Sequence, residues 1–240
     1  MLFKKKKKVH EETRKIVLTE DASLRIIEAY NRLKDNILYM SADGKNRVIQ
    51  VESAKAGEGK STIAANLAVG LGQTDRTVCV VDLDFRKPKV HTFFKLSKDI
   101  GISEFMRGVA KKEDIIKATE YKNVSIVTGG ETIHNSSFVL LSDVFKAFIE
   151  ELKTKFDYVI LDCPPVLQVS DYIHISKVSE GVLFVVAFGQ TTRQQVAEAI
   201  KELKRNNVNI LGTVFSKYNT KGKDYYYNQY YYYTRRDDEE

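Results

Sequence analysis

The feature that most constrains this 240-residue sequence is the stretch SAKAGEGKST, residues 53–62. It lies between an apolar, β-branched run at residues 48–52 and a helical pattern at residues 61–71. Gly57 and Gly59 allow backbone conformations that other residues avoid, and a backbone that closely approaches an anion needs such freedom. A strand, a glycine-containing loop and a helix in this order predict a phosphate-binding loop at a helix N-terminus.

The residues that follow the glycines fit two further roles in such a loop. A lysine at position 60 can neutralise the β- and γ-phosphate oxygens, and the hydroxyl of Ser61 can hold Mg²⁺. The strict pattern GxxxxGK[ST] has glycine at position 54, where this chain has Ala54, so the loop is a variant. A glycine-containing turn of an unrelated α/β protein is the alternative, which the number of matching features disfavours. The predicted nucleotide-binding residues are Ala54, Lys55, Ala56, Gly57, Glu58, Gly59, Lys60, Ser61 and Thr62.

Short β-branched runs alternate with helical patterns along the rest of the chain. An amphipathic helix is predicted at residues 22–38, where apolar residues recur at helical spacing. The further predicted strands are 77–82, 124–127, 158–162, 181–188 and 209–215, and the further helices are 142–155 and 193–206. This alternation predicts an α/β fold of the P-loop NTPase type, with a mostly parallel central sheet flanked by helices.

Acidic residues stand where two of the predicted strands end. Asp82 and Asp84 follow one apolar run, and Asp162 follows another. In open α/β sheets, ligands bind beyond the carboxyl ends of the strands. Three acids beside a phosphate loop are suited to coordinating Mg²⁺ and activating a nucleophile, although each acid alone could equally be a solvated or helix-capping carboxylate.

The two ends of the chain have unusual compositions. Lys4 to Lys8 carry five positive charges, in a chain whose net charge is +6. Residues 225–233 contain seven of the 13 tyrosines. We therefore expect a basic flexible arm at residues 1–21, a P-loop domain at 22–217 and a mobile tyrosine-rich tail at 218–240. The lysine run suits a solubilising arm, anionic lipid or nucleic acid, but the domain has no basic stripe with interleaved aromatics that would favour nucleic acid.

Cysteine or histidine metal sites, cysteine redox motifs, membrane-spanning helices and signal peptides are not indicated by the sequence. The two cysteines, Cys79 and Cys163, lack CxxC spacing, and the four histidines lack metal-ligand spacing. No apolar stretch approaches the roughly 18–20 residues that cross a bilayer, and no signal-peptide pattern follows the lysine run. A cytoplasmic protein is expected, held at the membrane only through a partner.

Together, these motifs resemble the bacterial tyrosine kinases (BY-kinases) of capsule and exopolysaccharide operons, in the Gram-positive form where the kinase is separate from its membrane activator. The likeness covers about residues 22–233, with residues 54–61 as Walker A, 78–84 as Walker A′ and 159–162 as Walker B. It implies an ATP-dependent protein-tyrosine autokinase. The implied phosphorylation sites are Tyr225, Tyr226, Tyr227, Tyr230, Tyr231, Tyr232 and Tyr233.

The same resemblance implies roles for the site residues. Lys60, Asp82 and Asp84 would be catalytic, with Asp82 acting as base or orienter for the tyrosine hydroxyl. Ser61, Asp82 and Asp162 would hold Mg²⁺ beside ATP.

Residues 216–219, Ser-Lys-Tyr-Asn, lack the NKxD sequence that recognises guanine, which favours ATP over GTP as the nucleotide.

The implied partners are a membrane activator or polysaccharide co-polymerase, a cognate tyrosine phosphatase and other copies of the chain. The family's ExxRxxR oligomerisation pattern would align with Glu28, Asn31 and Lys34, so both arginines are replaced here.

Two other functions stay open at this point. Partitioning and positioning ATPases share the sequence of residues 55–61, and in them a lysine at the position of Lys55 reaches nucleotide across a dimer. Such ATPases often end in an amphipathic membrane helix, which the tyrosine cluster does not resemble. A non-enzymatic scaffold with an adhesive aromatic tail is the third possibility.

Overall fold

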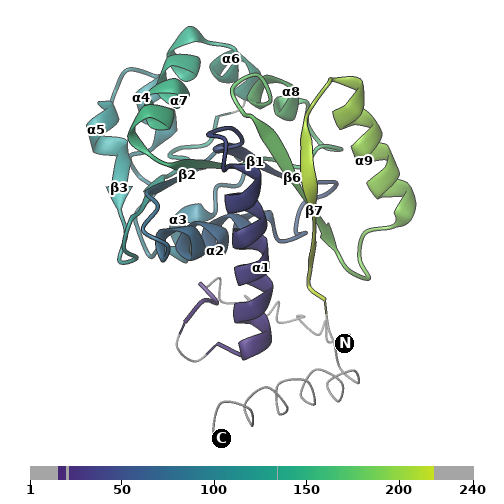
Figure 1. Ribbon diagram of the computed structural model, residues 1–240. Coiled ribbons are helices and arrows are strands. Elements are labelled where there is room, and N and C mark those ends of the chain that lie inside the picture. Colours follow the sequence, from purple (N-terminus) through teal and green to yellow (C-terminus); the bar gives the residue numbers. More distant parts are fainter. Residues whose placement is uncertain (1–15, 20–21, 134, 219–240) are drawn as a thin grey trace, which may run out of the picture.

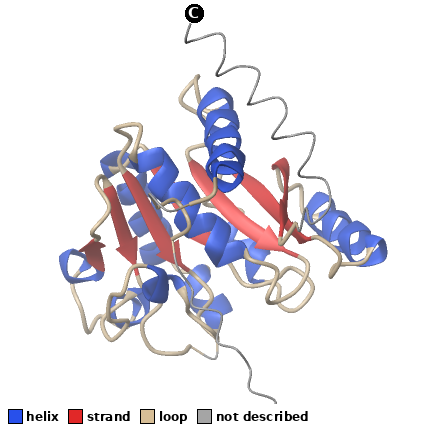
Figure 2. Ribbon diagram, turned by 90° about the horizontal axis from the view of Figure 1, so that it is seen from below, coloured by secondary structure: helices blue, strands red, loops and turns tan. Residues whose placement is uncertain are grey.

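The computed structural model describes residues 16–19, 22–133 and 135–218. Across these residues, seven strands form one sheet in the order β3-β4-β2-β5-β1-β6-β7, and helices cover both of its faces (Figure 2). The strands are β1 (Val48–Ser53), β2 (Val78–Asp82), β3 (Ile116–Ala118), β4 (Val124–Val127), β5 (Tyr158–Asp162), β6 (Gly181–Ala187) and β7 (Ile210–Ser216). The predicted α/β fold with a mostly parallel sheet is confirmed.

Helices of very different lengths connect these strands (Figure 1). The long helices were predicted to within about two residues at each end. The short ones, of four or five residues each, were not predicted, because they contain too few turns to show a period. The helices are α1 (Leu24–Met40), α2 (Lys60–Gly72), α3 (Val90–Phe93), α4 (Ile102–Met106), α5 (Lys112–Ile115), α6 (Ser136–Leu140), α7 (Asp143–Lys155), α8 (Asp171–Ile175) and α9 (Arg193–Arg205).

Strand β3 is the exception to the parallel arrangement. It pairs antiparallel with β4 at the edge of the sheet, whereas every other strand pair is parallel. The sequence did not predict β3, because its three residues, Ile116, Lys117 and Ala118, are too few to show an alternating pattern. It lies far along the sheet from the phosphate loop, on the other side of β4, β2 and β5.

The central strands are buried on both faces, and alternate side chains enter different cores. Val78 and Val80 of β2 pack against α2, whereas Cys79 and Val81 pack toward α7. All six residues of β1 are buried. Because helices cover both faces, a ligand is expected at the edge formed by the strands' carboxyl ends, as in other open α/β sheets.

Residues 16–18 pack against this domain and differ from the expected flexible arm at 1–21. Ile16 is buried, and the backbone N–H groups of Val17 and Leu18 donate to Asn66 Oδ1 on α2, at 2.7 and 3.3 Å. An apolar side chain beside a buried amide acceptor explains why this short segment is held. The rest of the expected arm, residues 1–15 and 20–21, lies outside the described residues, as do residues 219–240 of the expected tail.

Replacing Gly101 by alanine tests the packing between α4 and the end of β4. Gly101 has an extended backbone (φ −147°, ψ −161°), so alanine is not strained there, but its Cβ would overlap Thr128 O and lie 2.5 Å from Gly130 N. We expect Gly101→Ala to lower the free energy of unfolding by about 3 kcal/mol in urea titrations.

The matched control is Gly212→Ala on β7, where the added Cβ meets no atom of the described residues within 4 Å. That change should leave stability within about 0.5 kcal/mol or raise it slightly. Equal stability of the two variants would contradict this account of the backbone contact.

Candidate nucleotide and phosphoryl-transfer site

The phosphate loop joins the carboxyl end of β1 to the first turn of α2. Gly57 and Gly59 both have left-handed backbones, with φ of 81° and 94°, and Gly59 is the N-cap of α2. The helix begins at Lys60 and runs for 13 residues, so its N-terminal N–H groups face the loop. The predicted loop thus has the backbone shape and the helix end that favour binding of an anion.

Lys60 is the buried cation of this loop. Its side chain is nearly buried, and its Nζ donates to Ser53 Oγ at 3.2 Å, while Ser53 Oγ donates to the main-chain oxygen of Lys55 at 2.8 Å. The ammonium therefore folds back over the loop instead of extending into solvent. Such a position suits a charge that meets phosphate oxygens.

Asp82 and Asp162 are brought together by strand register. They are paired neighbours where β2 and β5 run parallel, so both carboxyl groups stand at the carboxyl edge, as the sequence predicted. The oxygens of fully buried Asp82 accept N–H groups from Lys89 at 2.7 Å, Val90 at 2.9 Å and Asp84 at 3.3 Å. Asp82 thereby holds the loop between β2 and α3 in place.

Burial raises the pKa of both carboxyl groups. Desolvation is the main cause of the strongly raised pKa of Asp82, and the charge of Asp162 raises it further. Desolvation also raises the pKa of Asp162 to about 6, although the Lys60 charge and the Ser61 hydroxyl act in the opposite direction. Because the two groups repel each other when both are ionised, a nearby cation would favour their charged forms.

Asp162 and Ser61 fit a magnesium ion. Asp162 Oδ1 is buried and has no hydrogen-bond partner in the described part of the chain, and Ser61 is close enough to lower the pKa of Asp162 by hydrogen bonding. No group of three or more His, Cys, Asp or Glu side chains among the described residues could hold a metal ion. Mg²⁺ bound to nucleotide needs only one or two protein ligands, since water and phosphate oxygens supply the rest.

Asp84 differs from Asp82 in being accessible. It is half-buried, and its Oδ1 accepts the N–H of Lys87 at 3.0 Å. It lies two residues after the end of the strand, near enough for its charge to raise the pKa of both Asp82 and Asp162. Of the two acids, Asp84 is the one that a substrate can approach without displacing a buried contact.

The other predicted loop residues all lie in or beside this turn. Ala54 is buried, Lys55 and Thr62 are half-buried, and Ala56 is exposed. Glu58 is nearly buried at 3% exposure, which is unusual for a carboxylate in a loop. The seven predicted phosphorylation sites, Tyr225 to Tyr233, lie outside the described residues.

The sequence analysis missed Glu52, a fully buried carboxyl group at the end of β1. Gln50 Nε2 donates to Glu52 Oε1 at 2.6 Å, and Glu52 Oε2 has no hydrogen-bond partner among the described residues. Burial raises its pKa to about 8, although Gln50 and the Lys60 charge lower it. The signal was available, because VIQVES places two polar residues inside a run that is otherwise apolar.

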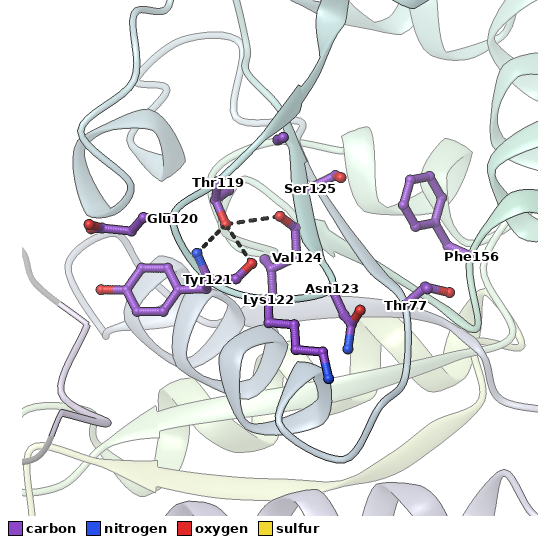
Figure 3. Close-up of a pocket in the computed structure, with 10 residues that line it drawn as sticks. Thr77, Thr119, Glu120, Tyr121, Lys122, Asn123, Val124, Ser125 and Phe156 are labelled. Atoms are coloured by element: carbon purple, nitrogen blue, oxygen red, sulfur yellow. Dashed lines mark hydrogen bonds between the residues drawn. The ribbon is translucent and has the colours of Figure 1, made fainter.

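The hollow in Figure 3 lies at the opposite edge of the sheet. Thr77, Val124 and Phe156, which line it, lie at or just before the amino ends of β2, β4 and β5. Its polar groups are satisfied locally, since the Thr119 hydroxyl bonds with Val124 O at 2.9 Å and with Tyr121 N at 3.1 Å. This hollow contributes nothing to the phosphate loop.

Sequence comparison shows what the chain is similar to. The AAA domain family AAA_31 matches residues 46–211. Over 211 residues the chain is 34% identical to the tyrosine-protein kinase YwqD of Bacillus subtilis (strain 168), and this covers 88% of the chain and 89% of YwqD.

Comparison of structures shows that the fold is shared with known proteins. The chimerical protein CapA2B2 superimposes with a TM-score of 0.80 at 30% identity, covering 85% of this chain and 89% of that one. The septum site-determining protein MinD of Pyrococcus horikoshii OT3, complexed with Mg-ADP, has a lower TM-score of 0.60 at 28% identity, covering 72% of this chain and 70% of MinD.

The raised pKa of Glu52 makes stability depend on pH. Because the folded protein binds this proton more tightly than the unfolded chain, the contribution is present below about pH 4.5 and is lost as the pH rises toward about 8. Replacing Glu52 by glutamine removes the ionisable group, so Glu52→Gln should be more stable than the wild type at pH 8.5, by on the order of 4 kcal/mol. Urea unfolding at pH 5.5 and 8.5 measures both effects.

The control for this prediction is Glu150→Gln, which changes an exposed carboxylate on α7. Its stability should follow the wild type at both pH values. If Glu52→Gln loses as much stability as the wild type between pH 5.5 and 8.5, Glu52 is not the group responsible.

Proposed function

The chain belongs to the AAA-domain family of bacterial tyrosine-protein kinases, and from that premise we propose that it transfers the γ-phosphoryl group of ATP to tyrosine side chains, including the seven in its C-terminal segment. Both the sequence match and the structural match extend over most of the chain. The kinase class comes from these relatives, and the choice of tyrosines comes from this sequence.

The observation that carries the proposal is that β7, the strand that precedes the tyrosine-rich residues, ends beside the phosphate loop. Ser216, the last residue of β7, donates from its hydroxyl to the main-chain oxygen of Glu58 within the loop. Tyr225 follows Tyr218 by seven residues, which span at most about 25 Å when extended. Because β7 ends in contact with the phosphate loop, that length suffices for Tyr225 to approach this site.

The loop residues would position the nucleotide. Mg·ATP bound here supplies the phosphoryl group that is transferred. Lys60 and the N–H groups at the start of α2 neutralise phosphate charge, while Ser61 and Asp162 hold the metal ion. Asp162 fits this role because its buried Oδ1 lacks another partner among the described residues.

Asp82 and Asp84 would orient the incoming tyrosine. A phenol has an ordinary pKa of about 10, so at neutral pH it needs an acceptor for its proton. In the transfer, a bond forms between the tyrosine oxygen and the γ-phosphorus, the bond to the β–γ bridging oxygen breaks, and the phenol proton passes to a carboxylate. Asp84 is the accessible acceptor, and Asp82 fixes the segment that carries it.

Partners and pathway follow from the family alone. We propose that a membrane activator binds the chain and stimulates it, that a tyrosine phosphatase reverses the reaction, and that copies of the chain associate. Capsular or exopolysaccharide synthesis and export would be the regulated process. Among the described residues, no helix is both long enough and apolar enough to cross a membrane. We propose that the activator holds the chain at the inner face of the membrane.

Mass spectrometry after incubation with Mg·ATP and the activator tests the kinase proposal. We expect phosphotyrosine within residues 225–233, reduced by roughly 10²-fold or more in Lys60→Met and in Asp82→Asn. As a control, Tyr39→Phe removes a tyrosine on α1 that is 85% exposed and should change nothing, because exposure alone does not make a substrate. Absence of phosphotyrosine in the wild type, with nucleotide bound, would exclude the kinase function.

A positioning ATPase is the second candidate, and one observation favours it. The Lys55 side chain, at the position that reaches across dimers in such ATPases, has no hydrogen bond or ion pair among the described residues, and MinD shares the fold. Release of inorganic phosphate without phosphotyrosine, abolished by Lys55→Ala, would support this function over the first.

A further inference from the structure

Glu58 connects the phosphate loop to a distant part of the chain. Its carboxylate accepts the N–H of Lys55 at 3.1 Å and the hydroxyl of Thr191, which lies 133 residues later in the turn between β6 and α9. Only 3% of Glu58 is exposed. A buried carboxylate is costly to leave without donors, so both contacts constrain the loop.

A second contact joins the loop to the end of β7. The Ser216 hydroxyl donates to the main-chain oxygen of Glu58, across 158 residues of sequence. A Cβ added at Gly59 would lie only 3.2 Å from Ser216 Cβ, so loop and strand are already in direct contact. Glycine at this position therefore serves the close approach as well as the left-handed turn.

Thr191 and Ser216 are in turn connected to each other. The oxygen of Ser216 accepts the N–H of Phe188 at 2.9 Å, and Thr191 N donates to Ala187 O at 3.1 Å. The ring of Tyr218 packs edge-on against Phe188 with centroids 4.7 Å apart. The phosphate loop, the β6–α9 turn and residues 216–218 therefore each contact the other two.

We propose that Glu58, Thr191 and Ser216 form a latch that couples nucleotide binding in the phosphate loop to the position from which the C-terminal tyrosine segment starts. Glu58 lies between the two left-handed glycines of the loop, so any rearrangement of that turn by bound phosphate is transmitted to both hydroxyl contacts. Ser216 is two residues before Tyr218, so the start of the tyrosine segment moves with it. These are positioning residues, and their consequence for tyrosine phosphorylation rests on the proposed function.

Hydrogen exchange with and without Mg·ADP tests the latch independently of kinase activity. In the full chain, Mg·ADP should slow amide exchange at residues 54–60 and, by about fivefold or more, at residues 216–218. In Thr191→Val and Ser216→Ala, the slowing at 54–60 should remain, while that at 216–218 falls below about twofold. A purely structural role would not produce this nucleotide-dependent difference.

Two control variants define the chemistry. Thr191→Ser keeps the hydroxyl and should restore coupling, whereas Thr213→Val makes the same isosteric change as Thr191→Val at an exposed position of β7 and should leave coupling intact. Thr191→Val removes the contact to the carboxylate of Glu58, and Ser216→Ala removes the contact to its main-chain oxygen. If one variant folds poorly, the other still tests the latch.

The outcomes separate the latch from the kinase proposal. Unchanged exchange at 216–218 on adding Mg·ADP, or the same slowing in the latch variants as in the wild type, would overturn the latch. Loss of phosphotyrosine in the wild-type assay, with nucleotide-dependent exchange intact, would overturn only the kinase proposal. If the latch and the kinase activity are both present, Ser216→Ala should slow phosphorylation of the chain's own tyrosines. This slowing should be about fivefold greater than the slowing measured with an added peptide of residues 219–240.

Discussion

The buried ammonium of Lys60 is the interaction on which the rest of the site depends. It lies at the start of α2, among the carboxyl groups of Glu52 and Asp162, whose pKa values its charge lowers while burial raises them. A buried charge is costly unless an opposite charge lies near it. At neutral pH that opposite charge is on Asp162, because the raised pKa of Glu52, about 8, keeps its carboxyl group mostly protonated. The balance makes the carboxyl groups responsive to any cation or anion that enters the loop, which is a property expected of a site for a metal–nucleotide complex.

The sheet provides this arrangement through its register. Val51 of β1 is paired with Asp162, and Asp162 with Asp82, so the ends of three adjacent parallel strands bring the loop and both acids to one place. Burial of the strands on both faces leaves little room for the backbone to shift. The positions of the acids are consequently set by apolar packing far from the chemistry.

The same edge also collects segments from the second half of the chain. Parallel strands end together, so the turn after β6 and the end of β7 arrive beside the phosphate loop although they are more than 130 residues from it in sequence. This explains how β7, the strand that precedes the tyrosine-rich residues in the sequence, ends beside the phosphate loop. It also explains why polar residues such as Thr191 and Ser216 are found there, since the buried backbone and carboxylate groups of the loop need donors.

The sequence by itself determined the strand–loop–helix unit, the alternation of long elements and the acids at the strand ends, because each is expressed in residues that are close together in the chain. Period and spacing are sufficient for these features. Strand β3 and the short helices had too few residues to be recognised in this way. Only the tertiary structure decided that Ile16 packs on the domain, that Glu52 is buried beside Lys60, and that Glu58 meets Thr191 and Ser216. The burial of Ile16 depends on packing beside Asn66 of α2, far along the chain from residue 16. The contacts of Glu58 depend on which strands become neighbours in the sheet, and no local pattern in the chain specifies that order.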